Sequence, residues 1–187
     1  VVKCVANFPA ISRGNSRQFD AQSDNGLREI MISTDPPYYD NIEYADLSDF
    51  FYVWMRQMLK NTYPTLFRTM LVPKTEELVA TPYRFGGSTE KARNFFEDGM
   101  FNTCCRLYQY AREDIPVTIY YAFKQSETDE MDSTASTGWE TMLSAIIRSG
   151  FAITGTWPIR TEMVNRGGAQ GTNSLASSIV LVCRKRA

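Results

Sequence analysis

Four consecutive residues, Asp35-Pro36-Pro37-Tyr38, are the best candidate for a chemical site in the sequence. Asp35 and Pro36 each precede a proline, which pushes both residues into extended backbone geometry. Because neither proline has an N–H group, the turn presents a carboxylate and a backbone carbonyl as hydrogen-bond acceptors, with an aromatic ring beside them. Such a turn suits a planar group that carries an amine: the acceptors take the N–H groups and the ring covers the π-face.

The composition limits which other chemistry is available. The 187 residues include no histidine, which removes serine–histidine and cysteine–histidine catalysis and histidine metal ligation from this chain. The four cysteines form no C-x-x-C pair of the kind found in zinc and redox sites: Cys4, Cys104, Cys105 and Cys183. We therefore expect buried free thiols in a reducing cytoplasm. The remaining chemistry must use carboxylates, backbone groups, aromatic rings or a cofactor.

The elements that must position the turn alternate between strands and helices. An apolar share of 43% supports one globular domain, and no apolar run reaches the roughly 18 residues that a membrane helix needs. Residues 1–7 are compatible with a strand. We predict strands over 29–33, 117–123, 151–160 and 177–183, helices over 47–60, 88–113 and 139–149, and an irregular segment over 63–87. Asp46 or Ser48 can cap the first of these helices and Ser88 the second, and Gly150 suits the left-handed position after the third.

This order predicts an α/β sheet with parallel pairs. The last two strands have no helix between them, so we expect them to form a C-terminal antiparallel hairpin. In open α/β sheets the ligand crevice lies at the carboxyl ends of the strands, and the turn at 35–38 follows such an end. The irregular segment at 63–87 is unusually long for a compact domain, and such segments are often functional.

The turn also carries a resemblance to a known family. Asp35-Pro36-Pro37-Tyr38 matches the (Asp/Asn)-Pro-Pro-(Tyr/Phe) motif of S-adenosylmethionine-dependent methyltransferases that act on exocyclic amino groups. The wider run at 35–54, from DPPYYDNI through YADLSDFFYVW, resembles the large adenine-specific DNA methylases that carry a zinc ribbon elsewhere. The run at 171–184, GTNSLASSIVLVCR, resembles the end of their catalytic domain. The resemblance extends over most of the chain from about Arg28 onward.

The resemblance implies a fold and a mechanism. The fold is a Rossmann-like class I methyltransferase sheet, and the partner is DNA whose target base is flipped out of the helix. Asp35 and the carbonyl of Pro36 accept hydrogen bonds from the exocyclic amine, Pro37 completes the turn, and Tyr38 stacks on the base. The methyl group comes from S-adenosylmethionine. Weaker candidates for the base pocket follow the turn, and each of these can instead shape it: Tyr39, Asp40, Asn41 and Tyr44.

Two features depart from the family pattern. No Phe-x-Gly-x-Gly loop, the cofactor-binding motif of the family, follows a strand, and the zinc-ribbon cysteines are absent from these 187 residues. The glycine-rich run at 166–171 joins two strands and does not replace the motif. Since the chain begins at Val1, we expect it to be the C-terminal portion of a catalytic domain, with the N-terminal part of the same protein as its partner. We assign no cofactor-binding residue and no metal ligand here.

Several alternatives stay open. The motif does not separate N6 of adenine from N4 of cytosine, a guanine amine in RNA or a glutamine side chain in a protein. A non-catalytic module that keeps the fold is a further alternative. The helix at 47–60 carries Phe50, Phe51 and Trp54, which we expect in the core rather than as platforms for stacking bases.

The charge distribution bears on DNA contacts. The net charge is -1, yet the segment from Thr156 onward carries five basic residues and one acidic residue. Arg160 and Arg166 lie in or near the glycine-rich run and are candidates for contacts with the DNA backbone. The basic run at 184–186 fits a solvated strand end equally well. A basic patch can steer nucleic acid even when the net charge is near zero.

Overall fold

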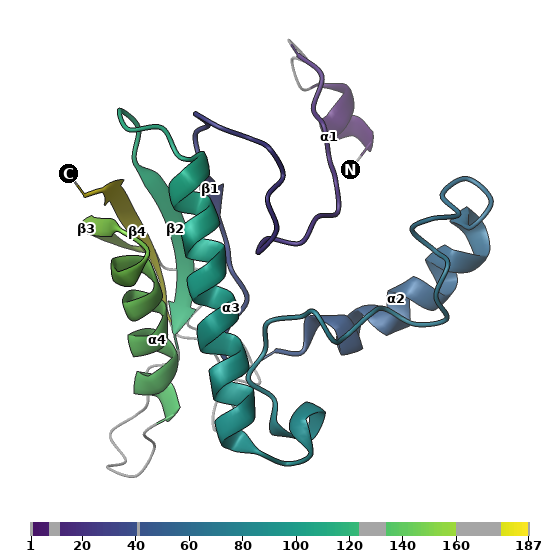
Figure 1. Cartoon of the computed structure of the whole chain (residues 1–187). Helices are drawn as coiled ribbons and strands as arrows, with labels where there is room; N and C mark the ends of the chain where they lie inside the picture. Colours follow the sequence, from purple (N-terminus) through teal and green to yellow (C-terminus); the bar gives the residue numbers. More distant parts are fainter. Residues whose placement is uncertain (1, 8–11, 41, 124–133, 160–176, 187) are drawn as a thin grey trace.

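The sheet is built around β2 (Val117–Phe123), whose β-branched and aromatic residues favour a buried strand. The computed structural model describes residues 2–7, 12–40, 42–123, 134–159 and 177–186. Four strands lie in the order β1-β2-β4-β3, with β1 (Ser33–Thr34) parallel to β2 (Figure 1). β4 (Ser177–Lys185) is antiparallel to both β2 and β3 (Phe151–Ile159). This mixed open sheet confirms the α/β class.

The strand predictions are confirmed to different degrees. β2 has the predicted bounds, and β3 and β4 form the expected antiparallel pair, with a register shift between Ile153 and Gly155. β1 is shorter than the predicted strand at 29–33. Ile30 instead forms an isolated bridge with Ala111, the residue that follows the helix at 89–110. The N–H of Ile30 donates to the carbonyl of Tyr110 at 2.9 Å. Glu29 has a φ of 53°, a left-handed backbone conformation that interrupts the strand just before Ile30.

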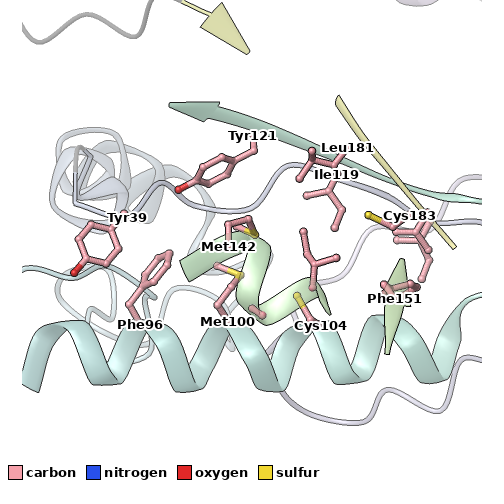
Figure 2. Close-up of a cluster of buried hydrophobic side chains, with 14 of the residues drawn as sticks. Tyr39, Phe96, Met100, Cys104, Ile119, Tyr121, Met142, Phe151, Leu181 and Cys183 are labelled. Atoms are coloured by element: carbon pink, nitrogen blue, oxygen red, sulfur yellow. The ribbon is translucent and has the colours of Figure 1, made fainter. Parts of the chain in front are cut away.

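Two helices cover one face of the sheet, α3 (Thr89–Tyr110) and α4 (Thr134–Arg148) (Figure 1). Ser88 caps α3 as predicted, since its Oγ accepts the N–H of Lys91 at 3.2 Å. Gly150 follows α4 with a φ of 106°, the left-handed residue expected after the helix. Figure 2 shows the core that these elements enclose, which includes Phe96, Met100, Cys104, Ile119, Met142 and Leu181.

The side chains of three cysteines are described, and two of the three are buried free thiols, as expected. Cys104 and Cys183 are buried, and Cys105 is half-buried; all three are free. Burial raises the pKa of Cys104 to about 12 and that of Cys183 to about 11, so both thiols stay protonated at neutral pH. Among the residues that the structure describes, no helix has the length and apolar character that crossing a membrane requires.

The first element is a helix, α1 (Val2–Ala6), and the strand considered for residues 1–7 is wrong. A strand needs a neighbour that completes its hydrogen bonds. In Figure 1, α1 lies apart from the sheet, so its backbone groups are satisfied within a helical turn instead.

The second helix, α2 (Tyr44–Leu59), projects away from the two layers, and the chain then runs back along it (Figure 1). We call residues 44–81 the arm and residues 60–81 its return segment. The core prediction for Phe50, Phe51 and Trp54 is wrong: their side chains are 69%, 64% and 60% exposed. The helical spacing of these residues is real, but within the described part of the chain neither the sheet nor another helix covers that face.

Candidate functional site

The Asp35-Pro36-Pro37 turn lies where the sequence places it, directly after the carboxyl end of β1. These three residues line a cavity of about 1150 Å³. Asp35 is exposed and the two prolines are half-buried. The cavity is somewhat larger than most small-molecule sites, which measure about 300–1,000 Å³.

Parts of the chain far apart in the sequence complete the wall of this cavity. Residues 18–22 form one side, the inner face of α2 another, and parts of the return segment a third. The lining includes four acidic side chains and one basic side chain: Asp20, Asp35, Glu76, Glu77 and Arg68. This excess of negative charge favours ligands that carry an amine or a positive charge over phosphate-rich ligands.

Two tyrosines of the predicted site stand side by side. The ring centroids of Tyr38 and Tyr44 are 6.4 Å apart, and the Tyr38 ring also meets Tyr121 edge-on at 6.3 Å. Tyr44 lines the cavity and is 43% exposed, whereas Tyr38 is half-buried and does not line it. Partial burial and the carboxylate of Asp35 raise the pKa of Tyr44, so its hydroxyl stays neutral at physiological pH.

Tyr39 turns away from the cavity and anchors the turn in the core. Its side chain is 8% exposed, and its ring packs edge-on against Phe96 with the centroids 5.1 Å apart (Figure 2). Its carbonyl accepts the N–H of Ala80 at 2.8 Å. Burial raises the pKa of Tyr39. Tyr39 therefore holds the turn in place, and its ring does not face a ligand in the cavity.

Of the remaining predicted site residues, the structure describes one. Asp40 is exposed and is not part of the cavity wall. Asn41, Arg160 and Arg166 lie outside the described residues, as does the glycine-rich run at 166–171. Within the described part of the chain, no group of three cysteine, aspartate or glutamate side chains is placed to hold a metal ion.

The start of α2 is fixed by charged residues that the sequence analysis did not single out. The helix was expected to begin at Leu47 with Asp46 or Ser48 as its cap; it begins at Tyr44, and neither side chain caps it. Glu77 of the return segment does so instead, its Oε1 accepting the N–H of Ala45 at 3.0 Å. The partner is 32 residues away, so no local pattern indicates this contact.

Arg84 links this contact to the rest of the arm. Its guanidinium lies 2.9 Å from Oε2 of Glu77 and 2.5 Å from Oδ2 of Asp46. Lys74 pairs with Asp49 at 2.7 Å, and Asp49 also accepts the N–H of Val72 at 2.8 Å. These contacts join α2 to its return segment beside the cavity. Hydrogen bonds from Arg84 and Lys74 lower the pKa of Asp46 and of Asp49, respectively.

The site therefore combines an exposed carboxylate, a rigid turn and a tyrosine ring at the rim of an acidic cavity. Such an arrangement can hold a planar amine, with Asp35 as acceptor and Tyr44 against its face. Neither a family model, nor a curated protein, nor a solved structure matches this chain.

Proposed function

We propose that this chain is part of a DNA methyltransferase that acts on the exocyclic amino group of a flipped base, N6 of adenine, with S-adenosylmethionine as methyl donor. The observation that carries the proposal is the position of Asp35-Pro36-Pro37 at the carboxyl end of β1, bordering the 1150 Å³ cavity. A catalytic turn of the resembling family is expected in such a place. The sheet supports a partial Rossmann-like methyltransferase fold, because it has a parallel pair and the expected C-terminal antiparallel hairpin.

The cavity suits the cofactor in size and charge. S-adenosylmethionine carries a sulfonium cation, and the lining has four acidic side chains against one basic side chain. When bound, the cofactor supplies an electrophilic methyl group. The motif that holds the cofactor in the resembling family is absent from these residues, so we assign no cofactor-binding loop to this chain.

The residues of this chain would orient the amine. The Asp35 carboxylate and the Pro36 carbonyl accept its two N–H groups, which draws the nitrogen lone pair out of ring conjugation and aims it at the methyl carbon. The bound cofactor would supply the methyl group to this nitrogen, and the nitrogen would release its proton to water. The resemblance assigns the stacking ring to Tyr38, and Tyr44 offers a second ring at the cavity wall. Stacking on an aromatic ring contributes about 1–3 kcal/mol per base.

The test is methyl transfer from labelled S-adenosylmethionine to DNA by the complete protein that contains this chain. Asp35→Ala is expected to lower the rate by about 100-fold or more, because it removes an oriented polar partner of the reacting group. Asp98→Ala is the matched control, since Asp98 is an exposed carboxylate of α3 outside the cavity wall. Equal incorporation by wild type and Asp35→Ala would contradict the proposal. Hydrolysis of the labelled product identifies the modified unit and separates adenine from cytosine, RNA and glutamine acceptors.

A further inference from the structure

The arm exposes several large apolar side chains to solvent. Phe50 and Trp54 of α2 are 69% and 60% exposed, and Met70 of the return segment is 75% exposed. The arm projects from the sheet and its two covering helices, so neither layer shields these side chains (Figure 1). Exposed apolar patches of this kind mark interaction sites.

The arm nevertheless has a small interior of its own, which keeps this surface in place. Phe67 is 4% exposed and packs against Tyr52, with the ring centroids 5.4 Å apart. The hydroxyl of Tyr52 lies 2.9 Å from Oγ1 of Thr69, and Nε of Arg56 donates to the carbonyl of Phe67 at 3.2 Å. The helix and its return segment are therefore joined along their length, and the exposed rings lie on the opposite side.

Charges are segregated along the arm. Asp46 and Asp49 lie in its first two turns and are paired with Arg84 and Lys74. Residues 50–73 contain no acidic residue and three basic ones: Arg56, Lys60 and Arg68. Lys60 and Arg68 are exposed, and the ion pairs found among the described residues include neither of them. Residues 50–73 therefore carry positive charge that no ion pair among the described residues compensates, on the same arm as the exposed aromatic rings.

This combination fits a nucleic acid strand. Proteins hold single strands by stacking bases on aromatic side chains while basic residues contact the phosphates. The position of the arm gives a second reason, because its inner face and Arg68 line the same cavity as Asp35. A strand that lies along the arm can therefore deliver a base to the cavity, with one phosphate at Arg68, the basic side chain of the lining.

We infer that residues 44–81 form the nucleic-acid-binding arm of this protein. Phe50 and Trp54 stack on unpaired bases beside the target base, and Lys60 and Arg68 contact phosphates. The inference rests on the proposed function, since that function requires a base to be presented to the Asp35 turn. It extends that function by assigning the surface that holds the strand, and it replaces the core role expected for Phe50 and Trp54.

The test measures binding of a fluorescein-labelled 20-nucleotide single-stranded DNA to the complete protein by fluorescence anisotropy, without cofactor. Phe50→Ala and Trp54→Ala are each expected to weaken binding by roughly tenfold. The double variant Lys60→Gln/Arg68→Gln should flatten the plot of log affinity against log salt by about 0.7 for each phosphate that it no longer neutralises. Trp157→Ala and Lys91→Gln are the matched controls, since Trp157 is 67% exposed on β3 and Lys91 is exposed on α3. Circular dichroism checks that each variant is folded.

The outcomes separate this inference from the proposed function. Wild-type affinity in all arm variants overturns the inference, even if Asp35→Ala abolishes methyl transfer. Weakened binding in the arm variants supports it, even if no methyl transfer is detected. The alternative is that the arm binds a second copy of the chain, which sedimentation of the same variants tests. If the wild-type protein is a dimer that Trp54→Ala dissociates, and the DNA affinity is unchanged, the arm binds a second copy and the inference is overturned.

Discussion

Gly138 of α4 lies so close to Tyr39 that a Cβ atom at position 138 would stand 2.8 Å from Cβ of Tyr39 and 3.2 Å from its Cγ. The carbonyl of Gly138 also accepts a hydrogen bond from the hydroxyl of Tyr121 in β2 at 3.3 Å. The helix, the strand and the residue that anchors the candidate turn therefore meet at one point. A side chain at this glycine would push against Cβ of Tyr39, whose ring is buried against Phe96.

Gly138→Ala is expected to destabilise the protein. Alanine is favoured over glycine in a helix by about 1 kcal/mol, but overpacking a core costs about 1–3 kcal/mol. We expect a net loss of about 1 kcal/mol in the free energy of unfolding, measured by urea denaturation. Gly14→Ala is the control, because no atom lies within 4 Å of the added Cβ. A Gly138→Ala protein as stable as wild type would contradict the close contact.

The elements that could be predicted from the sequence are those whose partners are local. The β-branched and aromatic run at 117–123 gave the bounds of β2, and the hydroxyl of Ser88 marked the start of α3. Both signals depend on residues within a few positions of the element. The position of Asp35 after a strand was predictable for the same reason.

The cavity and the arm could not be predicted, because they depend on contacts between distant residues. Helical spacing indicated that Phe50 and Trp54 share a face, but it carries no information on whether another element covers that face. Glu77 caps α2 from 32 residues away, and residues 18–22, which precede the turn in the sequence, also line the cavity. Only the assembled fold brings these groups together.

Arg84→Met is expected to loosen the base of the arm. The side chains of Arg84 and Glu77 are 12% and 13% exposed, so the variant leaves a largely buried carboxylate without its cation. Breaking buried ion pairs costs about 3–5 kcal/mol, and we expect about 3 kcal/mol here, with faster hydrogen exchange of the α2 amides than in wild type.

A double variant and a control make this prediction specific. Adding Glu77→Gln to Arg84→Met removes the unpaired charge but keeps an acceptor for the N–H of Ala45, so part of the lost stability should return. Arg93→Met is the control: the Arg93–Glu97 pair is about half-exposed at 3.7 Å, and its loss should cost less than about 0.5 kcal/mol. Equal destabilisation by Arg84→Met and Arg93→Met would show that the arm does not depend on Arg84.

Acid is expected to release the arm before the core unfolds. The pKa values of Asp46 and Asp49 are lowered in the folded state from the ordinary value of 3.8. Their stabilising contribution is therefore fully present above about pH 4 and is lost as the pH falls through the lowered folded-state pKa values. Amide chemical shifts can be followed by NMR from pH 7 to pH 2. Those of α2 and the return segment should approach random-coil values at a higher pH than those of α3.

Asp49→Asn provides the control for the acid prediction. Asparagine keeps an acceptor for the N–H of Val72 but loses the charge that pairs with Lys74. The arm of this variant should be looser at pH 7 and should change less between pH 4 and pH 2. High salt should weaken the wild-type contact at neutral pH, since Asp49 and Lys74 are both partly exposed. An arm that stays ordered until α3 melts would contradict the assignment to these carboxylates.

The neighbouring rings of Tyr38 and Tyr44 differ in their access to a base in the proposed reaction. Tyr44 lines the cavity and Tyr38 packs against Tyr121, so we expect Tyr44 to provide the main stacking surface. Tyr44→Ala should raise the KM for DNA roughly tenfold, the effect of removing one stacking ring, while Tyr44→Phe keeps the ring and stays near wild type. Tyr38→Ala should instead lower the unfolding free energy by removing a packed ring. A normal KM in Tyr44→Ala, together with a raised KM in a stably folded Tyr38→Ala, would return the stacking role to Tyr38, because the cavity would then have to open toward that ring when the base enters.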